Sequence, residues 1–371
     1  MTWPFPAQLA GAFAGAGAHV EALCPPRAVL ARSRYVARLH RYNALAPMES
    51  LCQAIAAARP DMIIPCDDLA AEQVNRAYGN ASIGRMDFLI RAAGAGAPAV
   101  PAIALDSEDR LDEVTRRLGV PLVIKSDHSW GGEGVAIAAT RQEAHAAFHR
   151  LTQQSRLRNL GRALRGRGAH FLTRALHPAA ASLSAQRFVE GQPATSSIAC
   201  WQGRIVAAHH FDVLLSTTPT SPASVIAAVG CPQMQASAHA IAKALNLSGL
   251  FGLDYVRDRA GQVHLLEMNP RATPTMHLAL EQDLPAALLG AAGLPARARP
   301  PVTDRRKIAL FPREWLRDPA SPWLTEAFHD VPWEDPEVVR ACVRAAPPAA
   351  QALLKNAPGP AVRTKSPVFE A

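Results

Sequence analysis

The sequence predicts a protein that combines a parallel α/β region with α+β regions. Near the amino terminus, helical segments alternate with short apolar strands such as VEALCP and PDMIIPCDD, which is typical of a parallel α/β layer. Further along, strands follow one another around tight turns, as in GLFGLDYVRDRAGQVHLLEMN, which indicates antiparallel sheet. The chain has 371 residues, 49% of them hydrophobic, so it is long enough to bury a sizeable core.

Composition favours a soluble protein of a reducing compartment. No uninterrupted apolar run reaches about 18 residues, so we expect neither a membrane span nor a membrane partner. The six cysteines are scattered and form no C-x-x-C pair. This usage argues against a structural zinc site and a disulfide scaffold, and it predicts a cytoplasmic location.

The net charge of +8 is concentrated in one stretch. Between Arg141 and His177 there are eight arginines and a single acidic residue, Glu143. Three interpretations stay open: a solvated helix face, a nucleic-acid surface, or a lid over a phosphate-rich ligand. Aromatic interleaving and a helix-turn-helix pattern are both absent from the sequence here, so we expect no nucleic-acid partner.

In the first 82 residues we expect helices at 7–22 and 48–59. A short strand, VEALCP, lies between them, and a buried strand follows in PDMIIPCDD, where residues 62–64 form a compact apolar run before a proline and two acids. The region opens with a helix where a parallel α/β unit normally opens with a strand. We therefore expect a small α/β domain, with truncation of its first strand as one explanation.

The middle of the chain is expected to hold short strands and helices in alternation. A helix at 86–93 precedes a Gly/Ala/Pro loop, and Ser107 is expected to cap a helix at 108–118. VPLVIKSD reads as a strand, followed by a glycine turn, a return strand and a helix at 141–154. AQRFVEG reads as a strand and a turn, and TSSIACWQGRIVAAHHF as two strands joined at Gln202-Gly203.

The last third is expected to begin with a helix at 234–246 and the strands GLFGLDYV and VHLLEMN. PARARPP marks a boundary, after which we expect a strand at KIALF, a helix at 337–346 and a proline-rich tail. We identify no chemistry in residues 301–371.

The strongest functional signal is a group of oxygen ligands on two neighbouring strands. Glu267 and Asn269 are two residues apart, so their side chains share a face, and a hairpin would bring Asp254 beside them. Two carboxylates and an amide oxygen suit Mg²⁺ that also binds nucleotide phosphates. Arg271 follows directly, where a guanidinium can neutralise a phosphoryl group or form a structural ion pair with one of these acids.

A second signal is a lysine at the end of an apolar strand, followed by a glycine-rich loop. Lys125 ends VPLVIK, and Gly131, Gly132 and Gly134 follow within ten residues. Small residues let backbone N–H groups approach phosphate oxygens. The loop is not a Walker A motif, which ends in G-K-[ST], and alone it fits an ordinary glycine-rich hairpin equally well.

A third signal is the strand AQRFVEG, whose edge could pair with an adenine ring while Glu190 accepts ribose hydroxyls. In this order, the three signals resemble the ATP-grasp family over about residues 83–290, in the carboxylate–amine ligase type with an ATP-binding domain like that of the carbamoyl-phosphate synthase large chain. The resemblance implies an ATP-grasp fold, in which two α+β lobes clamp ATP. It also implies four regions: a preceding α/β domain at 1–82, a small lobe at 83–185, a large lobe at 186–300 and a carboxyl-terminal extension at 301–371.

The resemblance also implies roles for individual residues, with ATP and Mg²⁺, or alternatively Mn²⁺, as cofactors. By position, the phosphate contacts are Arg85, Lys125 and the glycine loop, the adenine hinge is Gln186, Arg187, Phe188 and Val189, the metal ligands are Asp254, Glu267 and Asn269, and the catalytic residues are Lys125 and Arg271. Two positions depart from the family pattern. Arg85 stands where a lysine is usual, and Gln192-Pro193 stand where many relatives carry the ribose-binding acid, for which Glu190 is our substitute.

The implied activity is ADP-forming ligation of a small-molecule carboxylate to an amine through an acyl phosphate. Family members are often dimers, so a homodimer is an expectation. Three other functions stay open: an ATP-grasp kinase, a carboxylase-like enzyme, or a nucleotide-binding regulatory protein with a degraded site. The sequence does not identify the acid or the amine.

Overall fold

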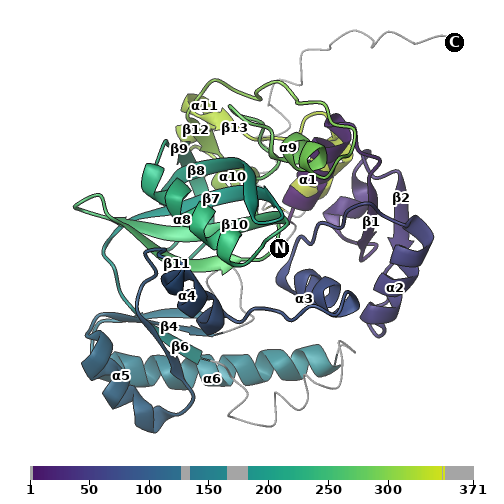
Figure 1. Cartoon of the computed structure of the whole chain (residues 1–371). Helices are drawn as coiled ribbons and strands as arrows, with labels where there is room; N and C mark the ends of the chain where they lie inside the picture. Colours follow the sequence, from purple (N-terminus) through teal and green to yellow (C-terminus); the bar gives the residue numbers. More distant parts are fainter. Residues whose placement is uncertain (1–2, 127–133, 165–182, 345, 347–371) are drawn as a thin grey trace, which may run out of the picture.

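The computed structural model describes residues 3–126, 134–164, 183–344 and 346, with only the backbone of 154–164. In this part of the chain there are three sheets: a parallel pair, a four-stranded sheet and a seven-stranded sheet. Figure 1 shows the four-stranded sheet and its helices below the large sheet, with the amino-terminal elements to one side. The mixture of parallel and antiparallel layers agrees with the predicted fold class.

The amino-terminal unit is built around β1 and β2, which pair in parallel. Its elements are α1 (Phe5–Gly15), β1 (Glu21–Cys24), the 3₁₀ helix η1 (Val29–Arg32), β2 (Arg38–Arg41), α2 (Pro47–Ala58) and α3 (Asp68–Ala77). Asp67 caps α3, because its carboxylate accepts a hydrogen bond from the Ala70 N–H at 2.7 Å. This cap fixes the two acids of the PDMIIPCDD motif at the start of a helix.

The strand predicted at residues 62–64 is wrong, because the segment has no regular secondary structure and belongs to no sheet. Met62 and Ile64 instead pack against the core that α1 and α9 (Leu284–Ala291) form under the large sheet. The Pro65 carbonyl accepts a hydrogen bond from the Ala272 N–H at 2.9 Å. The apolar run is therefore half-buried against another part of the chain and not between flanking strands.

The small lobe has a four-stranded antiparallel sheet in the order β3-β6-β4-β5. Its elements are β3 (Ala102–Leu105), η2 (Glu108–Arg110), α5 (Leu111–Leu118), β4 (Leu122–Ser126), β5 (Val135–Ala138), α6 (Arg141–Leu164) and β6 (Leu183–Arg187). Helix α4 (Arg85–Gly94) precedes them in the chain and packs on the large sheet. Leu122, Ile124 and Ala185 are completely buried against α5 and α6. The helix predicted at 141–154 is thus longer, and the backbone continues it to Leu164.

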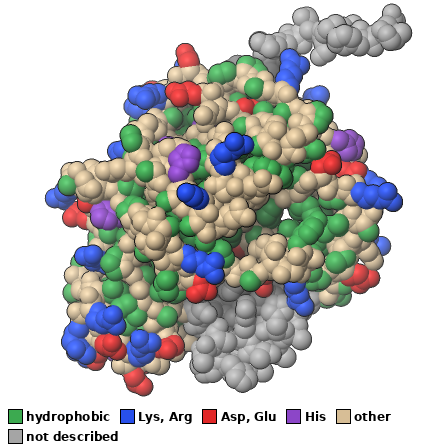
Figure 2. All heavy atoms as spheres, viewed as in Figure 1, with side chains coloured by type: hydrophobic (Ala, Val, Ile, Leu, Met, Phe, Trp, Pro, Cys, Tyr) green, Lys and Arg blue, Asp and Glu red, His purple; other side chains and the backbone are tan. Residues whose placement is uncertain are grey.

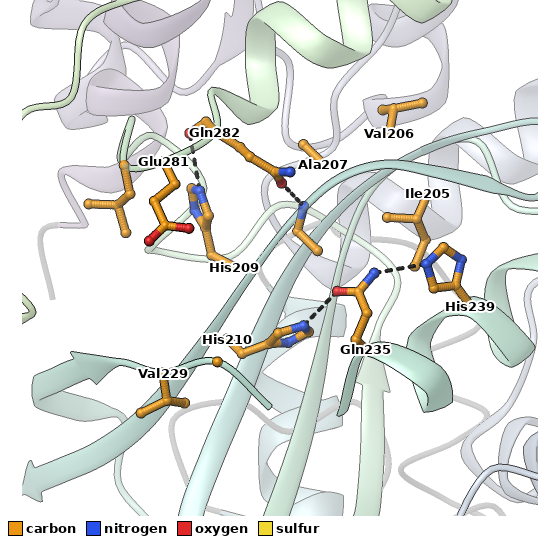
Figure 3. Close-up of a pocket in the computed structure, with 13 residues that line it drawn as sticks. Ile205, Val206, Ala207, His209, His210, Val229, Gln235, His239, Glu281 and Gln282 are labelled. Carbon is orange, nitrogen blue, oxygen red and sulfur yellow. Dashed lines mark hydrogen bonds between the residues drawn. The ribbon is translucent and has the colours of Figure 1, made fainter. Parts of the chain in front are cut away.

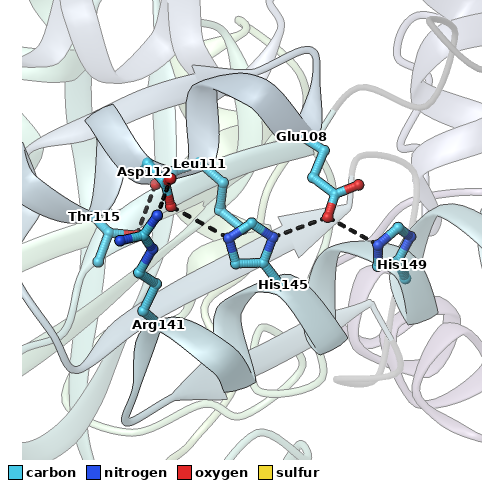
Figure 4. A network of polar contacts seen from close by, with 7 residues as sticks. All are labelled: Glu108, Leu111, Asp112, Thr115, Arg141, His145 and His149. Carbon is cyan, nitrogen blue, oxygen red and sulfur yellow. Dashed lines mark hydrogen bonds and ion pairs between the residues drawn. The ribbon is translucent and has the colours of Figure 1, made fainter.

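The predicted cap at Ser107 is also wrong. Residues 108–110 form a 3₁₀ turn, the α-helix begins at Leu111, and the Ser107 side chain makes no capping hydrogen bond. Glu108 of this turn and Asp112 in the first turn of α5 both contact His145 on α6 (Figure 4). The turn is therefore held by contacts with a distant helix and not by a local cap.

The surface of the small lobe carries both signs of charge (Figure 2). Arg141 pairs with Asp112, and Arg117 lies 3.5 Å from Glu113. Most of the arginines in the basic stretch lie in 154–182, where no side chain is described. The two arginines of the stretch with described side chains, Arg141 and Arg150, are exposed, and the three interpretations of the whole stretch stay open.

The large sheet has the order β11-β10-β7-β8-β9-β12-β13 and is antiparallel except for its last pair. Its strands are β7 (Gly191–Trp201), β8 (Arg204–Ser216), β9 (Ala223–Ala228), β10 (Gly249–Asp258), β11 (Val263–Asn269), β12 (Lys307–Ala309) and β13 (Phe328–His329). Helix α8 (Pro232–Ala244) and α4 cover one face, where Ile198, Leu253 and Tyr255 are buried. Helices α1 and α9 cover part of the other face (Figure 1).

The carboxyl-terminal elements close over the amino-terminal unit. They are α10 (Arg313–Arg317), α11 (Trp323–Glu326) and α12 (Pro336–Arg344). Trp315 and Val338 bury themselves with Ala7 of α1 and Val29 of η1 in one core. His277 lies 3.0 Å from Asp330, and Gln8 donates to the Asp330 carbonyl at 3.1 Å. The two ends of the described chain therefore stabilise each other.

Both segments of the chain that connect the small lobe to the large sheet lie against β11. On the first, the Val100 N–H donates to the Leu265 carbonyl at 3.0 Å, and the Leu265 N–H donates to the Pro98 carbonyl at 2.8 Å. Beside the second, Gln186 Nε2 donates to the Leu266 carbonyl at 3.1 Å. Gly191 then begins β7 so close to β10 that a Cβ atom would lie 2.2 Å from the Arg257 carbonyl oxygen. Only glycine fits there.

Candidate functional site

The predicted oxygen ligands come together on β10 and β11. The register places Asp254 directly opposite Glu267 and Gly252 opposite Asn269, and a bulge follows Asp254. Because side chains alternate along a strand, Glu267 and Asn269 share a face. Asn269 Nδ2 donates to Asp254 Oδ2 at 2.9 Å, and Thr195 Oγ1 on β7 donates to Asp254 Oδ1 at 2.9 Å. The Asp254 carboxylate is therefore held on both of its oxygens.

Glu267 connects the large sheet to the small lobe. Its Oε2 atom lies 3.2 Å from Lys125 Nζ on β4 and 3.5 Å from Arg85 Nη2 at the start of α4. Lys125 is 6% exposed, so its ammonium is turned into the junction and not into solvent. Two cations from separate elements thus converge on one carboxylate, 142 residues beyond Lys125 in the chain.

The two carboxyl groups differ in their electrostatic surroundings. Burial raises the pKa of Glu267, but the charges of Lys125 and Arg85 outweigh it, and the pKa falls to about 2. Burial also raises the pKa of Asp254, and the neighbouring Glu267 charge raises it further, against the lowering effect of the hydrogen bond from Thr195. Glu267 is therefore ionised at neutral pH, and Asp254 would gain most from an added cation.

Arg271 is placed between the site and the amino-terminal unit. Its Nη2 atom donates to Asn269 Oδ1 at 3.2 Å, and its Nε atom donates to Asp68 Oδ1 at 2.8 Å. The ion pair predicted as the alternative role of Arg271 thus exists, but with Asp68 on α3 and not with a strand acid. The guanidinium is 12% exposed, so it is largely fixed in orientation.

These donors fit Mg²⁺ by their chemistry. Two carboxylates and an amide are hard oxygen ligands, and Mg²⁺ in proteins typically binds one or two carboxylates together with substrate phosphates and water. Two like-charged side chains face each other at Asp254 and Glu267, which a divalent cation would stabilise. Within the described residues no group of three or more His, Cys, Asp or Glu side chains could hold a metal by itself. A metal here would depend on Asn269 and on ligand oxygens.

The proposed hinge residues lie where β6 leaves the small lobe. Gln186 is buried, Arg187 is exposed, and Phe188 and Val189 are half-buried. Glu190 is exposed and its carboxylate lies 2.7 Å from Arg259, so in this state a surface arginine occupies the proposed ribose acceptor.

Only the end of the glycine loop is described. The Gly134 carbonyl accepts a hydrogen bond from the Ser126 N–H at 2.8 Å, next to the pairing of β4 with β5. Gly131 and Gly132 lie outside the described residues.

Sequence reasoning missed two residues of this site, Asp68 and Thr195. Both hold a proposed functional side chain, Arg271 in one case and Asp254 in the other. Asp68 had a signal, since two acids directly follow an apolar run and open a helix. Thr195 had none, because its role depends on the register of β7 with β10.

Comparisons with known proteins agree with this architecture. The family model described as "Carbamoyl-phosphate synthase L chain, ATP binding domain" matches residues 85–162. No curated protein matches the sequence. No described helix has the length and apolar character needed to cross a membrane.

Several solved structures share the fold at low sequence identity. An L-amino acid ligase from Bacillus licheniformis has a TM-score of 0.57 at 14% identity, covering 79% of this chain and 74% of that one. An N5-carboxyaminoimidazole synthetase from Staphylococcus aureus has a TM-score of 0.56 at 12% identity, covering 80% and 76%.

A carboxylase domain gives a similar match. The biotin carboxylase domain dimer of the Hydrogenobacter thermophilus 2-oxoglutarate carboxylase, in complex with MgADP and bicarbonate, has a TM-score of 0.57 at 15% identity, covering 82% and 71%. These proteins have the ATP-grasp fold, and this chain has it too. The resemblance drawn from the sequence is confirmed at this level.

Proposed function

We propose that this protein is an ADP-forming carboxylate–amine ligase that binds Mg-ATP between the four-stranded and seven-stranded sheets. One observation carries the proposal: Lys125, Arg85, Glu267 and Asp254 converge at the junction of the two sheets, with Arg271 beside Asn269. Two fixed cations beside two carboxylates provide contacts both for phosphate oxygens and for their counter-ion.

Each residue has a role that follows from its position. Lys125 and Arg85 would exchange Glu267 for phosphate oxygens, while Asp254, Glu267 and Asn269 would hold Mg²⁺, which neutralises phosphate charge when bound. The hinge residues 186–189 would offer backbone groups to the adenine ring. These assignments rest on the contacts described above and on the ATP-grasp fold.

The reaction would proceed in two balanced steps. A substrate carboxylate oxygen attacks the γ-phosphorus, the bond to the β-phosphate oxygen breaks, and ADP leaves. An amine then attacks the acyl carbon, phosphate leaves, and the amine nitrogen loses a proton. Arg271 would stabilise charge on the transferring phosphoryl group, a role for which a single arginine contributes about 10³-fold or more in related chemistry. Asp68 would keep its guanidinium in place.

A screen of acids and amines tests this proposal. The protein is incubated with Mg-ATP and a panel of amino acids and small carboxylic acids, with and without a second amine, and ADP release and product mass are measured. We expect ADP release that needs both partners, and a product with the mass of acid plus amine minus water. ADP release with a phosphorylated product and no amine would make the protein a kinase.

The same screen includes bicarbonate, because the carboxylase domain superposes as well as the amino acid ligase. Bicarbonate-dependent ADP release without a second carboxylate would assign the protein to the carboxylases. Calorimetry with ATP and Mg²⁺ covers the remaining alternative. Nucleotide binding without turnover on any substrate would indicate a regulatory protein.

A further inference from the structure

A cavity lies at the free edge of β8, away from the proposed nucleotide site. Strand β9 pairs with β8 only from Phe211 onward, and the chain then turns away at Val229 toward α8. The uncovered stretch of β8 is flanked by α8 on one face and by residues 280–282 on the other, and the cavity between them has a volume of about 340 Å³ (Figure 3).

The register of the large sheet separates this cavity from the metal ligands. His209 on β8 lies opposite Ser197 on β7, Ser197 lies opposite Gly252, and Gly252 lies opposite Asn269. Three strand spacings place the His209 backbone ~14 Å from that of Asn269. A ligand bound in this cavity would therefore occupy a site separate from the proposed phosphate contacts.

Hydrogen bonds to Gln235 and Ser196 orient two histidines on the α8 side of the cavity. Gln235 Nε2 can only donate, so His239 Nε2, at 2.9 Å, accepts. Gln235 Oε1 must then accept from His210 Nε2 at 2.8 Å, and His210 Nδ1 accepts from Ser196 Oγ at 2.7 Å. Burial lowers the pKa of His210, which keeps it neutral in this arrangement. This wall therefore carries no fixed charge from His210.

On the opposite wall, acceptors are left over. His209 Nε2 lies 3.1 Å from the Gln282 carbonyl and donates to it. Burial lowers the pKa of His209 to about 4, so the ring is neutral at neutral pH and Nδ1 is an acceptor. That atom is buried and receives no hydrogen bond from the described residues. The Ala208 N–H donates to Gln282 Oε1 at 2.8 Å, and its carbonyl points to the same free edge, because both groups of a strand residue face one side.

Glu281 adds a negative charge to these acceptors. It is the one Asp, Glu, Lys or Arg side chain among the lining residues, it is exposed, and within the described structure it forms no ion pair or hydrogen bond. Apolar side chains of Ile205, Val229 and Leu280 complete the lining. In a protein with a net charge of +8, this cavity combines unpaired acceptors, one carboxylate and an apolar surface.

We propose that this cavity binds a small organic cation, a protonated amine with a short apolar body. The ammonium group would donate to Glu281 and to the Ala208 carbonyl at the free edge of β8, and the hydrocarbon part would lie on Ile205, Val229 and Leu280. An anion would meet Glu281 without a compensating cation, and a neutral alcohol would leave its charge unpaired. The cavity thus selects by charge as well as by size.

Methyl-resolved NMR of the full chain tests this, with n-butylammonium as the probe and n-butyrate and n-butanol as matched anionic and neutral analogues. The methyl groups of Ile205, Val229 and Leu280 report on the cavity directly. We expect n-butylammonium to shift these signals in a saturable way, and both analogues to bind at least about fivefold more weakly. No nucleotide is present, so the result does not depend on the proposed ligase activity.

The variant Glu281→Gln removes the charge and keeps the shape, and Glu326→Gln is a matched control at another exposed, unpaired glutamate on α11. We expect Glu281→Gln to weaken n-butylammonium binding about threefold or more and Glu326→Gln to leave it unchanged. Equal binding of the alcohol, an unaffected Glu281→Gln variant, or shifts confined to other methyl groups would each overturn the proposal.

Discussion

The junction at Glu267 and the cavity at β8 satisfy buried polar groups in opposite ways. At the junction, opposite charges compensate one another, and Lys125 and Arg85 both contact the carboxylate of Glu267. At the cavity, the neutral rings of His209 and His210 are fixed by hydrogen bonds to uncharged partners. The first arrangement can exchange one ion for another at little cost, as a triphosphate and its metal require. The second leaves acceptors that a donor can fill.

Removing the junction carboxylate should have the largest effect. In Glu267→Gln the Lys125 and Arg85 cations lose their shared counter-charge and the proposed metal set loses one ligand. We expect ADP release to fall about 10³-fold while ATP still binds. Turnover assays and calorimetry measure the two properties, with Glu326→Gln as the control. Undiminished ADP release would refute the metal assignment.

Removing the charge of Asp68 should have a smaller effect at the same site. In Asp68→Asn the Arg271 guanidinium keeps its bond to Asn269 but loses its ion pair. We expect kcat to fall about tenfold with KM for ATP nearly unchanged, because only the transferring group is affected. Asp67→Asn is the matched control, since asparagine caps a helix as well as aspartate does. Equal losses in both variants would mean that the helix, and not Arg271, is responsible.

The pH dependence of stability should separate the buried His209 from the half-buried His145. Burial lowers the pKa of His209 from 6.5 to about 4. The unfolded chain therefore binds more protons between these values, so stability present above pH 6.5 is lost as the pH falls, by up to about 3 kcal/mol. A hydrogen bond to Glu108 raises the pKa of His145 (Figure 4), so its stabilising contribution is present below pH 6.5 and lost as the pH rises.

Chemical denaturation at several pH values measures this contrast. His209→Asn should reduce the loss of unfolding free energy toward pH 4.5, and His145→Asn should reduce the loss above pH 6.5. The slope against pH is the measured quantity, so a constant offset from either substitution does not matter. Slopes of the same sign for both residues would contradict the difference between the two environments.

The sequence predicts local features of this protein better than long-range contacts. Asp254, Glu267 and Asn269 could be grouped because strand alternation and a short turn fix their relation. The apolar run at 62–64 was misread as a strand, because burial against α1 and α9 gives the same pattern as burial inside a sheet. The contact between Arg271 and Asp68 spans 203 residues and depends on how the units pack.

The cavity at β8 had no sequence signal for a related reason. His209 and His210 lie on a predicted strand that the family layout places beside the site, but nothing in the sequence connects them with Glu281, about seventy residues away. Their meeting depends on where β9 stops pairing with β8, which tertiary packing decides. Patterns of period two or 3.6 carry no information about the end of a neighbouring strand.

Both segments that connect the small lobe to the large sheet are hydrogen-bonded to Leu265 or Leu266, so β11 would be the axis of a rotation of the small lobe. In such a rotation the residues next to the axis, Glu267 among them, would have the smallest displacements. The 24-residue α6 is about 36 Å long, so a rotation of ~10° centred near one of its ends would move the other end by ~6 Å. The distance between a pair of fluorescent or spin labels on α6 and α8 would therefore change when nucleotide binding rotates the small lobe. The distance between the same labels placed along β11 would not change.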